Sequence, residues 1–166
     1  MINVFIDGKE GTTGLQIFER LGKRGDIRIS SLSEKLRKDL KARKEQINAA
    51  DIVFLCLPDA AARESVSLCE NKQVKIIDAS TAHRTDPSWA YGFPELSEEH
   101  RKKIAVSRRV AVPGCHASGF ISLVYPLVAG GIVSPDYPFV CHSVTGYSGG
   151  GKKMIAEYEA GGRDGA

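Results

Sequence analysis

"INVFIDGKEGTTGLQIFERLG", residues 2–22, contains the change of pattern that decides the fold. Ile2 to Ile6 is a short apolar run closed by Asp7, which predicts a buried β-strand. From Thr13 to Leu21 the apolar residues instead recur at helical spacing, and Gly22 then ends the pattern. A buried strand that leads through a glycine-rich turn into a helix predicts the first unit of an open α/β sheet.

The same alternation continues along the chain, so we predict an α/β fold with a Rossmann-like, doubly wound parallel sheet. Further strand candidates are Ile27 to Ser31, Asp51 to Pro58, Val74 to Ser80 and Arg109 to Val112. Helices are expected in the charged segment after Ser31, over Asp59 to Cys69 and over Gly119 to Val128. Thr81 to Glu99 has no regular period and predicts an irregular segment.

We divide the chain into a Rossmann-like domain over residues 1–114 and the incomplete start of a second α/β domain over residues 115–166. In the second part we expect a strand over Phe139 to Thr145 and a short helix over Lys152 to Glu159. The glycine-rich end, residues 160–166, is expected to be unstructured. Nothing after the predicted strand offers it a partner, so we expect this second domain to be incomplete.

The composition excludes several classes of protein. The 166 residues are 42% hydrophobic and 26% charged, an ordinary globular balance, and the net charge is only +3. Basic residues concentrate at Arg37 to Lys44, which predicts a solvated helix face rather than a nucleic-acid footprint. We expect no membrane span, because no uninterrupted apolar stretch is long enough, and no signal peptide, because the first residues enter a strand directly.

The cysteine pattern points to a reducing compartment. Cys56, Cys69, Cys115 and Cys141 lie far apart and form no Cys-x-x-Cys pair. This spacing argues against a zinc site or a disulfide framework, and we expect no bound metal. Unpaired thiols without a signal peptide favour the cytoplasm.

Glycines at the turn between the first strand and the first helix suggest a phosphate-binding site. Gly8, Gly11 and Gly14 lie three apart, where glycine permits close approach of the backbone to a ligand. The start of the helix offers free N–H groups and the positive end of its dipole. The spacing differs from the commoner Gly-x-Gly-x-x-Gly, and a tight turn that holds no ligand is the alternative.

The end of the second predicted strand bears on the choice of nucleotide. An NAD site usually has an acidic residue there to bind the ribose hydroxyls. This strand ends instead in hydroxyl residues, among them Ser31 and Ser33, with the cations Arg37 and Lys38 close behind. Hydroxyls with a cation suit a 2′-phosphate, so we expect NADP(H) rather than NAD(H). Alternatively, these residues only cap and cover a surface helix.

Cys115 is the candidate nucleophile. It follows Pro113-Gly114 and precedes an apolar helix, so it can lie at the helix N-terminus, where the dipole favours a thiolate. The alternative for any cysteine is a small buried residue, which we expect for Cys56 in its apolar strand and for Cys69 on its helix. Cys141 is expected to be half-buried in a strand.

The histidines offer weaker candidates. His116 is adjacent to Cys115, but neighbours along a chain often point apart, and we do not assign it as the base. His83 and Arg84 follow a sheet strand, where open α/β sheets place ligands, and together they suit an anionic group. Surface solvation or a loop-stabilising hydrogen bond is the alternative for both. His100 lies among charged residues and is expected to be exposed.

Five stretches in order along the chain, "DGKEGTTGL", "DASTAHRT", "WAYGFPEL", "VPGCHASG" and "SVTGYSGGGKKM", together resemble one family. The sequence is similar to the shorter type of N-acetyl-γ-glutamyl-phosphate reductase of arginine biosynthesis, itself similar to aspartate-semialdehyde dehydrogenase. The resemblance implies an NADPH-dependent oxidoreductase that reduces an acyl phosphate to N-acetylglutamate semialdehyde and phosphate, and a homo-oligomer in the complete enzyme. It makes the second domain the catalytic, substrate-binding and dimerisation domain.

The resemblance also implies roles for individual residues. Cys115 would attack the acyl phosphate and form a thioester, which the cofactor reduces. The residues implied to bind the cofactor are Gly8, Gly11, Thr12, Thr13, Gly14, Ser31, Ser33, Arg37, Ser148, Gly149 and Gly150. The residues assigned to the substrate are His83, Arg84 and Ser118.

One departure from the family pattern affects the expected activity. The family's acid-base histidine lies well downstream of the stretch that resembles "SGGGKK", and no histidine of this sequence occupies that position. We therefore expect an N-terminal part of the enzyme with weak or absent turnover by itself. Two alternatives stay open: an aspartate-semialdehyde dehydrogenase, distinguished by its substrate, and a nucleotide-binding module without catalysis, in which all four cysteines react slowly.

Overall fold

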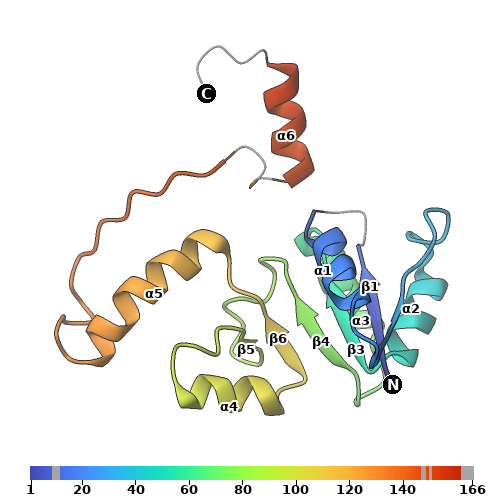
Figure 1. Ribbon diagram of the computed structural model, residues 1–166, viewed down its shortest axis with the longest axis horizontal. Helices are drawn as coiled ribbons and strands as arrows, with labels where there is room; N and C mark the ends of the chain where they lie inside the picture. The colour runs from blue at the N-terminus through green and yellow to red at the C-terminus, as the bar shows by residue number, and fades with distance from the viewer. Residues whose placement is uncertain (9–11, 147–148, 150, 162–166) are drawn as a thin grey trace.

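The parallel sheet organises the structure, a computed structural model that describes residues 1–8, 12–146, 149 and 151–161. Its strands are β1 (Ile2–Asp7), β2 (Ile27–Ser30), β3 (Ile52–Leu55), β4 (Lys75–Asp78), β5 (Ala90–Tyr91) and β6 (Arg109–Ala111). They form one six-stranded sheet in the order β2-β1-β3-β4-β6-β5, and every pairing is parallel (Figure 1). This confirms the predicted α/β class.

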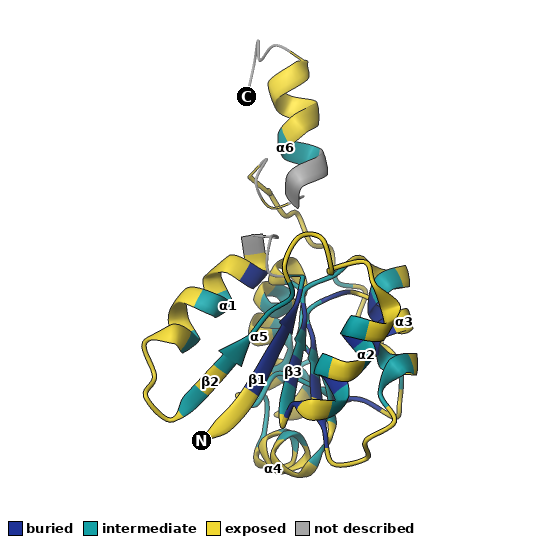
Figure 2. Ribbon diagram, turned by 90° about the vertical axis from the view of Figure 1, so that its right-hand side faces the viewer, coloured by how far each residue is buried: buried dark blue, intermediate teal, exposed yellow. Residues whose placement is uncertain are grey.

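The helices are α1 (Thr12–Gly22), α2 (Leu40–Ala49), α3 (Asp59–Leu68), α4 (Glu98–Val106), α5 (Cys115–Ala129) and α6 (Gly151–Ala160). Figure 2 shows α1 on one face of the sheet, and α2 and α3 on the other. The chain thus runs from β1 outward to β2, then returns past β1 to β3 and β4. This reversal is the topological switch point of a doubly wound sheet, which confirms the Rossmann-like prediction.

The hydrophobic core lies between the sheet and the α2–α3 layer. Phe5, Val53, Leu55 and Ile76 are fully buried from the strands, and Ile47 joins them from α2. Each fully buried side chain of this size stabilises the fold by about 1.5–3 kcal/mol relative to exposure. The buried residues concentrate in the strands, whereas most of α4, α5 and α6 is exposed (Figure 2).

A buried ion pair fixes α2 and α3 to the end of β1. Arg43 on α2 lies with its Nε 3.3 Å from the Asp7 carboxylate, and both side chains are almost fully buried. The same guanidinium donates to the Ser65 hydroxyl at 2.5 Å, which in turn donates to Asp7 at 2.7 Å. The interpretation of residues 37–44 as a solvated helix face is therefore wrong at Arg43. Residues 34–38 form turns before the helix rather than part of it.

Two elements were not predicted by the sequence pattern. The segment expected to be irregular contains the two-residue strand β5 and the start of α4. Ser97 caps α4 by accepting from the His100 N–H at 3.3 Å, and Glu98 and Glu99 lie in the first turn, where carboxylates favour the helix dipole. His100 is half-buried rather than exposed, because its ring meets that of Tyr125 on α5.

The predicted strand over residues 139–145 is wrong. This segment follows α5 as an extended, exposed chain without strand pairing among the described residues (Figure 1). Val140 and Val144 are 83% and 98% exposed. A strand needs a neighbouring strand to form backbone hydrogen bonds with, and no described strand lies beside this segment. Cys141, expected to be half-buried in this strand, is exposed. The predicted helix over residues 152–159 is confirmed as α6.

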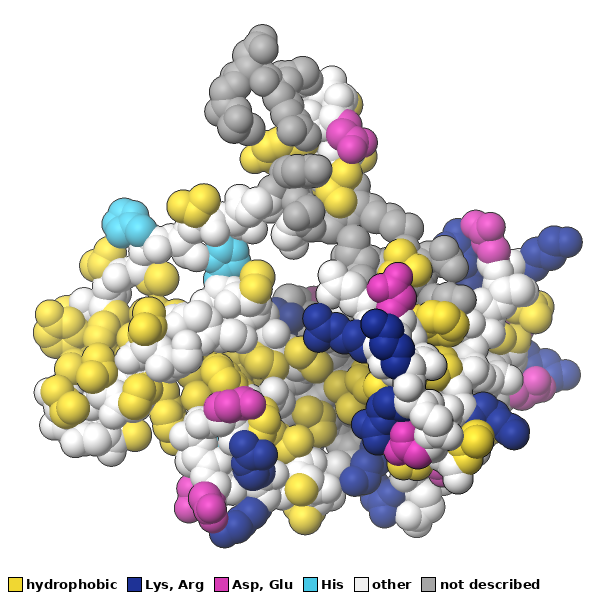
Figure 3. All heavy atoms as spheres, in the orientation of Figure 1, with side chains coloured by type: hydrophobic (Ala, Val, Ile, Leu, Met, Phe, Trp, Pro, Cys, Tyr) yellow, Lys and Arg dark blue, Asp and Glu magenta, His cyan; other side chains and the backbone are white. Residues whose placement is uncertain are grey.

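Hydrophobic side chains gather on the surface of the second part of the chain. Figure 3 shows them over α5 and the segment that follows it, on the left of the view. The exposed ones include Leu123, Ile132 and Tyr137, and no side chain of α5 is fully buried. None of the described helices is long and apolar enough to cross a membrane.

Candidate functional site

A cavity of about 730 Å³ opens at the carboxyl ends of β1 and β3. It is lined by Asp7 and Gly8, by residues after β2, by Cys56 to Pro58 and by the first turns of α3. In open α/β sheets, ligands bind at this edge, beside the strand where the order reverses. The fold therefore places this cavity where nucleotides bind in doubly wound sheets.

Gly8 can only be glycine at this position. Its φ is +93°, and a Cβ built on it would lie 2.3 Å from the carbonyl oxygen of Cys56. A side chain would therefore be strained and would push apart the ends of β1 and β3. Glycine at this position therefore lets the ends of β1 and β3 lie close together, and Gly8 itself lines the cavity.

The other predicted cofactor residues of the first half lie around this cavity to different extents. Arg37 lines it directly, and Ser31 and Ser33 flank Leu32, which also lines it. Ser33 shapes the turn, because its carbonyl oxygen accepts from the N–H groups of Leu36 and Arg37 at 3.0 Å. Thr13 is exposed near the start of α1, and Gly14 is buried behind it.

The remaining cofactor predictions are only partly covered by the structure. Gly11, Ser148 and Gly150 lie outside the described residues, and of Thr12 only its place as the first residue of α1 is described. Gly149 is exposed, donates its N–H to the Gly146 carbonyl at 2.9 Å, and does not line the cavity. The cofactor roles of all these residues stay predictions.

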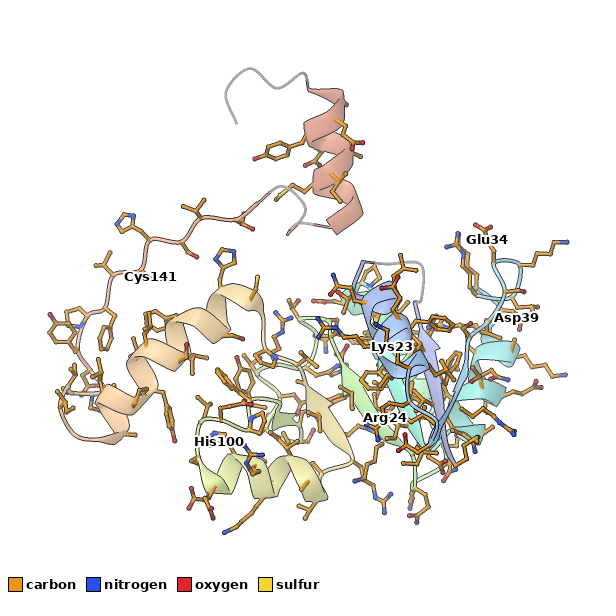
Figure 4. The ribbon with its side chains drawn as sticks, viewed as in Figure 1. Lys23, Arg24, Glu34, Asp39, His100 and Cys141 are labelled. Carbon is orange, nitrogen blue, oxygen red and sulfur yellow. The ribbon has the colours of Figure 1, made fainter. Side chains whose placement is uncertain are left out.

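A carboxylate at the cavity was missed by the sequence reasoning, which looked for an acidic residue only at the strand end. Glu34 lines the cavity and lies 3.3 Å from the Arg37 guanidinium, on the segment between β2 and α2 (Figure 4). Lys38 follows on the same wall. The cavity lining as a whole carries three cations, the third being Arg43, and three carboxylates, the others being Asp7 and Glu64, with which Arg43 is paired.

Cys56 borders the cavity without being a nucleophile. It lies half-buried just after β3, not inside the strand as expected. Burial above all, together with the carboxylates of Asp7 and Asp78, raises the pKa of its thiol to about 11. The thiol therefore stays protonated at neutral pH, and a protonated thiol is a poor nucleophile.

Cys115 lies in a different environment. It is exposed and is the first residue of α5, which the chain enters shortly after β6. The N-cap, Gly114, brings no side chain to the helix start, so the first N–H groups stay free of a side-chain cap. Ser118 donates its N–H and its hydroxyl back to the Gly114 carbonyl, each at 2.8 Å. The predicted place of Cys115 at a helix N-terminus is confirmed.

Arg84 brings a positive charge to the same helix start. Its Nε donates to the Val112 carbonyl at 2.9 Å, and its Nη2 donates to the Ala79 carbonyl at 3.2 Å. The Nη1 atom lies so close to Gly114 that a Cβ there would be only 2.8 Å away. A cation and free helix N–H groups together make this corner of the sheet suitable for an anion.

His83 is buried rather than open to a ligand. Its Nδ1 lies 2.6 Å from the Asp78 carboxylate, and its ring stacks on Trp89 with centroids 4.1 Å apart. Only 5% of the residue is exposed. The contacts with Asp78 and Trp89 thus match the alternative in which His83 stabilises the loop. A direct contact of His83 with substrate stays a prediction.

A second cavity, of about 600 Å³, lies between the start of α5 and residues 139–146. Cys115 and His116 line it together with Cys141, His142 and Ser143. The His116 Nδ1 forms a hydrogen bond with the Ser143 hydroxyl, so the imidazole is held by residues 139–146. Figure 4 labels Cys141 on the same segment. Among the described residues, no three His, Cys, Asp or Glu side chains lie together as a metal site.

The comparisons with known proteins point in one direction. Residues 22–104 match the family model described as semialdehyde dehydrogenase, NAD binding domain. N-acetyl-gamma-glutamyl-phosphate reductase of Chelativorans sp. is 55% identical over 161 residues, covering 97% of this chain and 52% of the relative. N-acetyl-gamma-glutamyl-phosphate reductase 2 of Pseudomonas putida is 54% identical, covering 94% of this chain and 50% of the relative. The chain thus spans about half the length of the curated relatives it matches.

Solved structures agree on the fold. Aspartate semialdehyde dehydrogenase from Francisella tularensis matches 96% of this chain and 48% of that one, with a TM-score of 0.68 at 19% identity. Aspartate semialdehyde dehydrogenase II from Vibrio cholerae matches 96% of this chain and 51% of that one, with a TM-score of 0.64 at 17% identity. At such low identity these likenesses establish the shared architecture alone.

Proposed function

Because the chain belongs to the family of semialdehyde dehydrogenase NAD-binding domains, we propose that it serves the NADPH-dependent reduction of N-acetyl-γ-glutamyl phosphate. The products are N-acetylglutamate 5-semialdehyde and phosphate. One observation carries the proposal: the nucleotide cavity and the exposed Cys115 lie at the carboxyl edge of one parallel sheet. The reductases of Chelativorans and Pseudomonas putida, named for this reaction, support the choice of substrate.

Cys115 opens the reaction. Its thiolate sulfur attacks the acyl carbon, a C–S bond forms, and the bond from carbon to the phosphate oxygen breaks as phosphate leaves with the electron pair. The cofactor, when bound, supplies the hydride that reduces the thioester. The C–S bond then breaks, which releases the aldehyde and returns the thiolate. The free N–H groups at the start of α5 and the guanidinium of Arg84 support negative charge at the reacting end.

The cavity wall fits a nucleotide with a 2′-phosphate. Gly8 lines the cavity with its backbone, Arg37 and Lys38 present cations, and the cavity is large enough for a drug-sized ligand. Gly8 would face the pyrophosphate, and Arg37 would hold the 2′-phosphate, with Ser31 and Ser33 at the adenosine end. Homo-oligomer formation and a cytoplasmic location stay predictions.

Cofactor preference provides the test. Replacing Arg37 with Ala is expected to raise the Kd for NADPH about tenfold and to leave the Kd for NADH almost unchanged, because only NADPH carries the extra phosphate. Isothermal titration of both nucleotides against the purified chain measures the two constants. Glu34→Gln is the matched control on the same turn, and it is expected to tighten NADPH binding by removing the carboxylate partner of Arg37. Equal losses for both nucleotides in Arg37→Ala would contradict the 2′-phosphate assignment.

A further inference from the structure

A buried cluster follows β4 at the carboxyl edge of the sheet, the edge at which the first cavity opens. We call Asp78, Ser80, His83 and Trp89 the His83 clamp. The Asp78 side chain is fully buried, and it accepts from the Ser80 N–H at 2.9 Å and from the Ser80 hydroxyl at 2.7 Å. The His83 Nδ1 lies 2.6 Å from the same carboxylate. Each polar atom of the cluster is thus held by a specific partner in a dry environment, which favours a single geometry.

The backbone closes the clamp around the histidine ring. The His83 carbonyl accepts from the Asp86 N–H at 3.2 Å, and the Asp86 carbonyl accepts from the Trp89 N–H at 3.0 Å. These two turns bring the indole back against the imidazole, with the ring planes 10° from parallel. Before His83 in the chain, Thr81 donates hydrogen bonds from its N–H and its hydroxyl to the Asp59 carboxylate at the start of α3. The loop is therefore fixed on both sides of His83.

The residue after His83 connects the His83 clamp to the start of α5, where Cys115 lies. Arg84 follows directly along the chain, and its guanidinium bridges the carbonyls of Ala79 and Val112 while its Nη1 lies against Gly114. No acceptor for that Nη1 lies within hydrogen-bond distance in the part of the chain that the structure describes. The hydrogen bonds of Arg84 among the described residues go to carbonyl groups rather than to a carboxylate, although its charge also helps to lower the pKa of the Asp59 carboxyl. Because Arg84 is half-buried, its position depends on the backbone that the clamp holds.

We propose that His83 is a positioning residue for Cys115, which acts by fixing Arg84 against the first turn of α5. This role rests on the proposed function, since Cys115 matters as a nucleophile only there. It differs from the expected contact between His83 and substrate, because the imidazole faces Asp78 and Trp89 and is almost fully buried. It also accounts for glycine at position 114, where a φ of −77° suits any residue but a Cβ would displace the Arg84 guanidinium.

Two alkylating reagents of different charge test the role. Iodoacetate is an anion and iodoacetamide is neutral, and both react with a thiolate by forming an S–C bond as iodide leaves. The ratio of their rates at one cysteine reports the local positive charge, whereas a general loosening of the fold changes both rates alike. We expect the ratio at Cys115 to exceed that at exposed Cys141 by about threefold in low salt, and to fall toward it in 1 M salt. Peptide mass spectrometry of the labelled chain separates the sites.

Variants then isolate the clamp. His83→Phe keeps a stacked ring beside Trp89 but loses the bond to Asp78, and it is expected to reduce the ratio at Cys115 to that at Cys141. Gly114→Ala leaves the clamp intact but moves the guanidinium, and the same fall is expected. His83→Gln, whose amide can donate to Asp78, should restore part of the ratio. His100→Gln is the matched control, because the His100 ring contacts Tyr125, ten residues beyond Cys115 on α5, and it should change nothing.

The possible results separate the two claims. A high ratio at Cys115 that survives His83→Phe, with NADPH affinity retained, overturns the positioning role and leaves the proposed function standing. Cys115 reacting no faster than Cys141 in the unmodified chain overturns the proposed function itself. If His83→Phe does not fold, as judged by NADPH titration, Trp89→Phe and Gly114→Ala provide the same comparison, and an unchanged ratio in both overturns the inference.

Discussion

The four cysteines differ in what surrounds their sulfur atoms. Cys56 is half-buried between two carboxylates, and Cys69 is half-buried at the end of α3, with its sulfur 3.6 Å from an Arg109 nitrogen. Cys115 and Cys141 are both exposed, but only Cys115 begins a helix beside a cation. At the scale of the residue, environment therefore favours Cys115 as the proposed nucleophile, a choice that sequence spacing leaves open.

The buried thiol of Cys56 makes stability depend on alkaline pH. Its pKa rises from 9.0 to about 11 on folding, because burial disfavours the thiolate. The folded state thus holds a proton that the unfolded state loses, so this contribution is complete below pH 9 and is lost as the pH rises to 11. We expect it to amount to roughly 3 kcal/mol.

Urea unfolding from pH 8 to 11 measures this effect. The free energy of unfolding should fall more steeply with pH in the unmodified chain than in Cys56→Ala, whose smaller core affects all pH values alike. Parallel curves for the two proteins would show that the thiol does not titrate at this raised value. Lysines and tyrosines titrate in both proteins and therefore cancel in the comparison.

At the scale of elements, α2 depends on one buried side chain more than on an apolar stripe. Arg43 joins Asp7, Glu64 and Ser65, and it thereby connects α2 to β1 and α3. The sequence presents Arg43 inside a basic run, and nothing in that run distinguishes it from its exposed neighbours. Only the three-dimensional position of Asp7, distant along the chain, explains why this arginine is inside.

Replacing Arg43 with Met is expected to destabilise the fold by about 3–5 kcal/mol, because it leaves the buried Asp7 carboxylate without its cation. Lys44→Met is the matched control, since Lys44 pairs with Glu70 at 2.6 Å on the exposed side of the same helix. That change should cost less than about 1 kcal/mol. Thermal unfolding of the two variants provides the comparison, and similar losses in both would contradict a structural role for the buried pair.

The sequence predicts elements best where the pattern is local. β1, α1, α3 and β4 follow from apolar runs and helical spacing within a few residues of each other, and the structure has them close to the expected bounds. The strand expected over residues 139–145 has the right alternation, but a strand also needs a partner, and periodicity carries no information about one. β5 was missed because two residues are too few to form a pattern, and its pairing with β6 is set by tertiary contact.

In the candidate site, too, the sequence predicts the features that depend on neighbouring residues and misses those that depend on tertiary contacts. The glycine turn and Cys115 are local signals, and the structure places Gly8 on the cavity wall and Cys115 at a helix start. The burial of His83 could not be read from its neighbours, because it depends on Trp89 stacking back across a turn. Glu34 lies beyond the strand end where ribose-binding carboxylates are sought, so its pairing with Arg37 appears only in the structure.

At the scale of the whole molecule, burial is uneven along the chain: the sheet is well packed, and the residues after β6 are mostly exposed. Buried residues concentrate in β1, β3 and β4, whereas α5 has no buried side chain and carries exposed Leu123 and Leu127 (Figure 3). The two parts meet at the carboxyl edge of the sheet, where β6 leads into Cys115. The proposed chemistry therefore combines a cofactor site built by the first part with a nucleophile that begins the second.

The rates of iodoacetamide labelling at the four cysteines of the folded chain test this account most directly. Cys141 is the internal reference, because it is as freely exposed as Cys115 but has neither a helix start nor Arg84 beside it. We predict that Cys115 reacts at least tenfold faster than Cys141, and faster still than half-buried Cys56 and Cys69. Equal rates at Cys115 and Cys141 would contradict the account and would favour a nucleotide-binding module without a nucleophile.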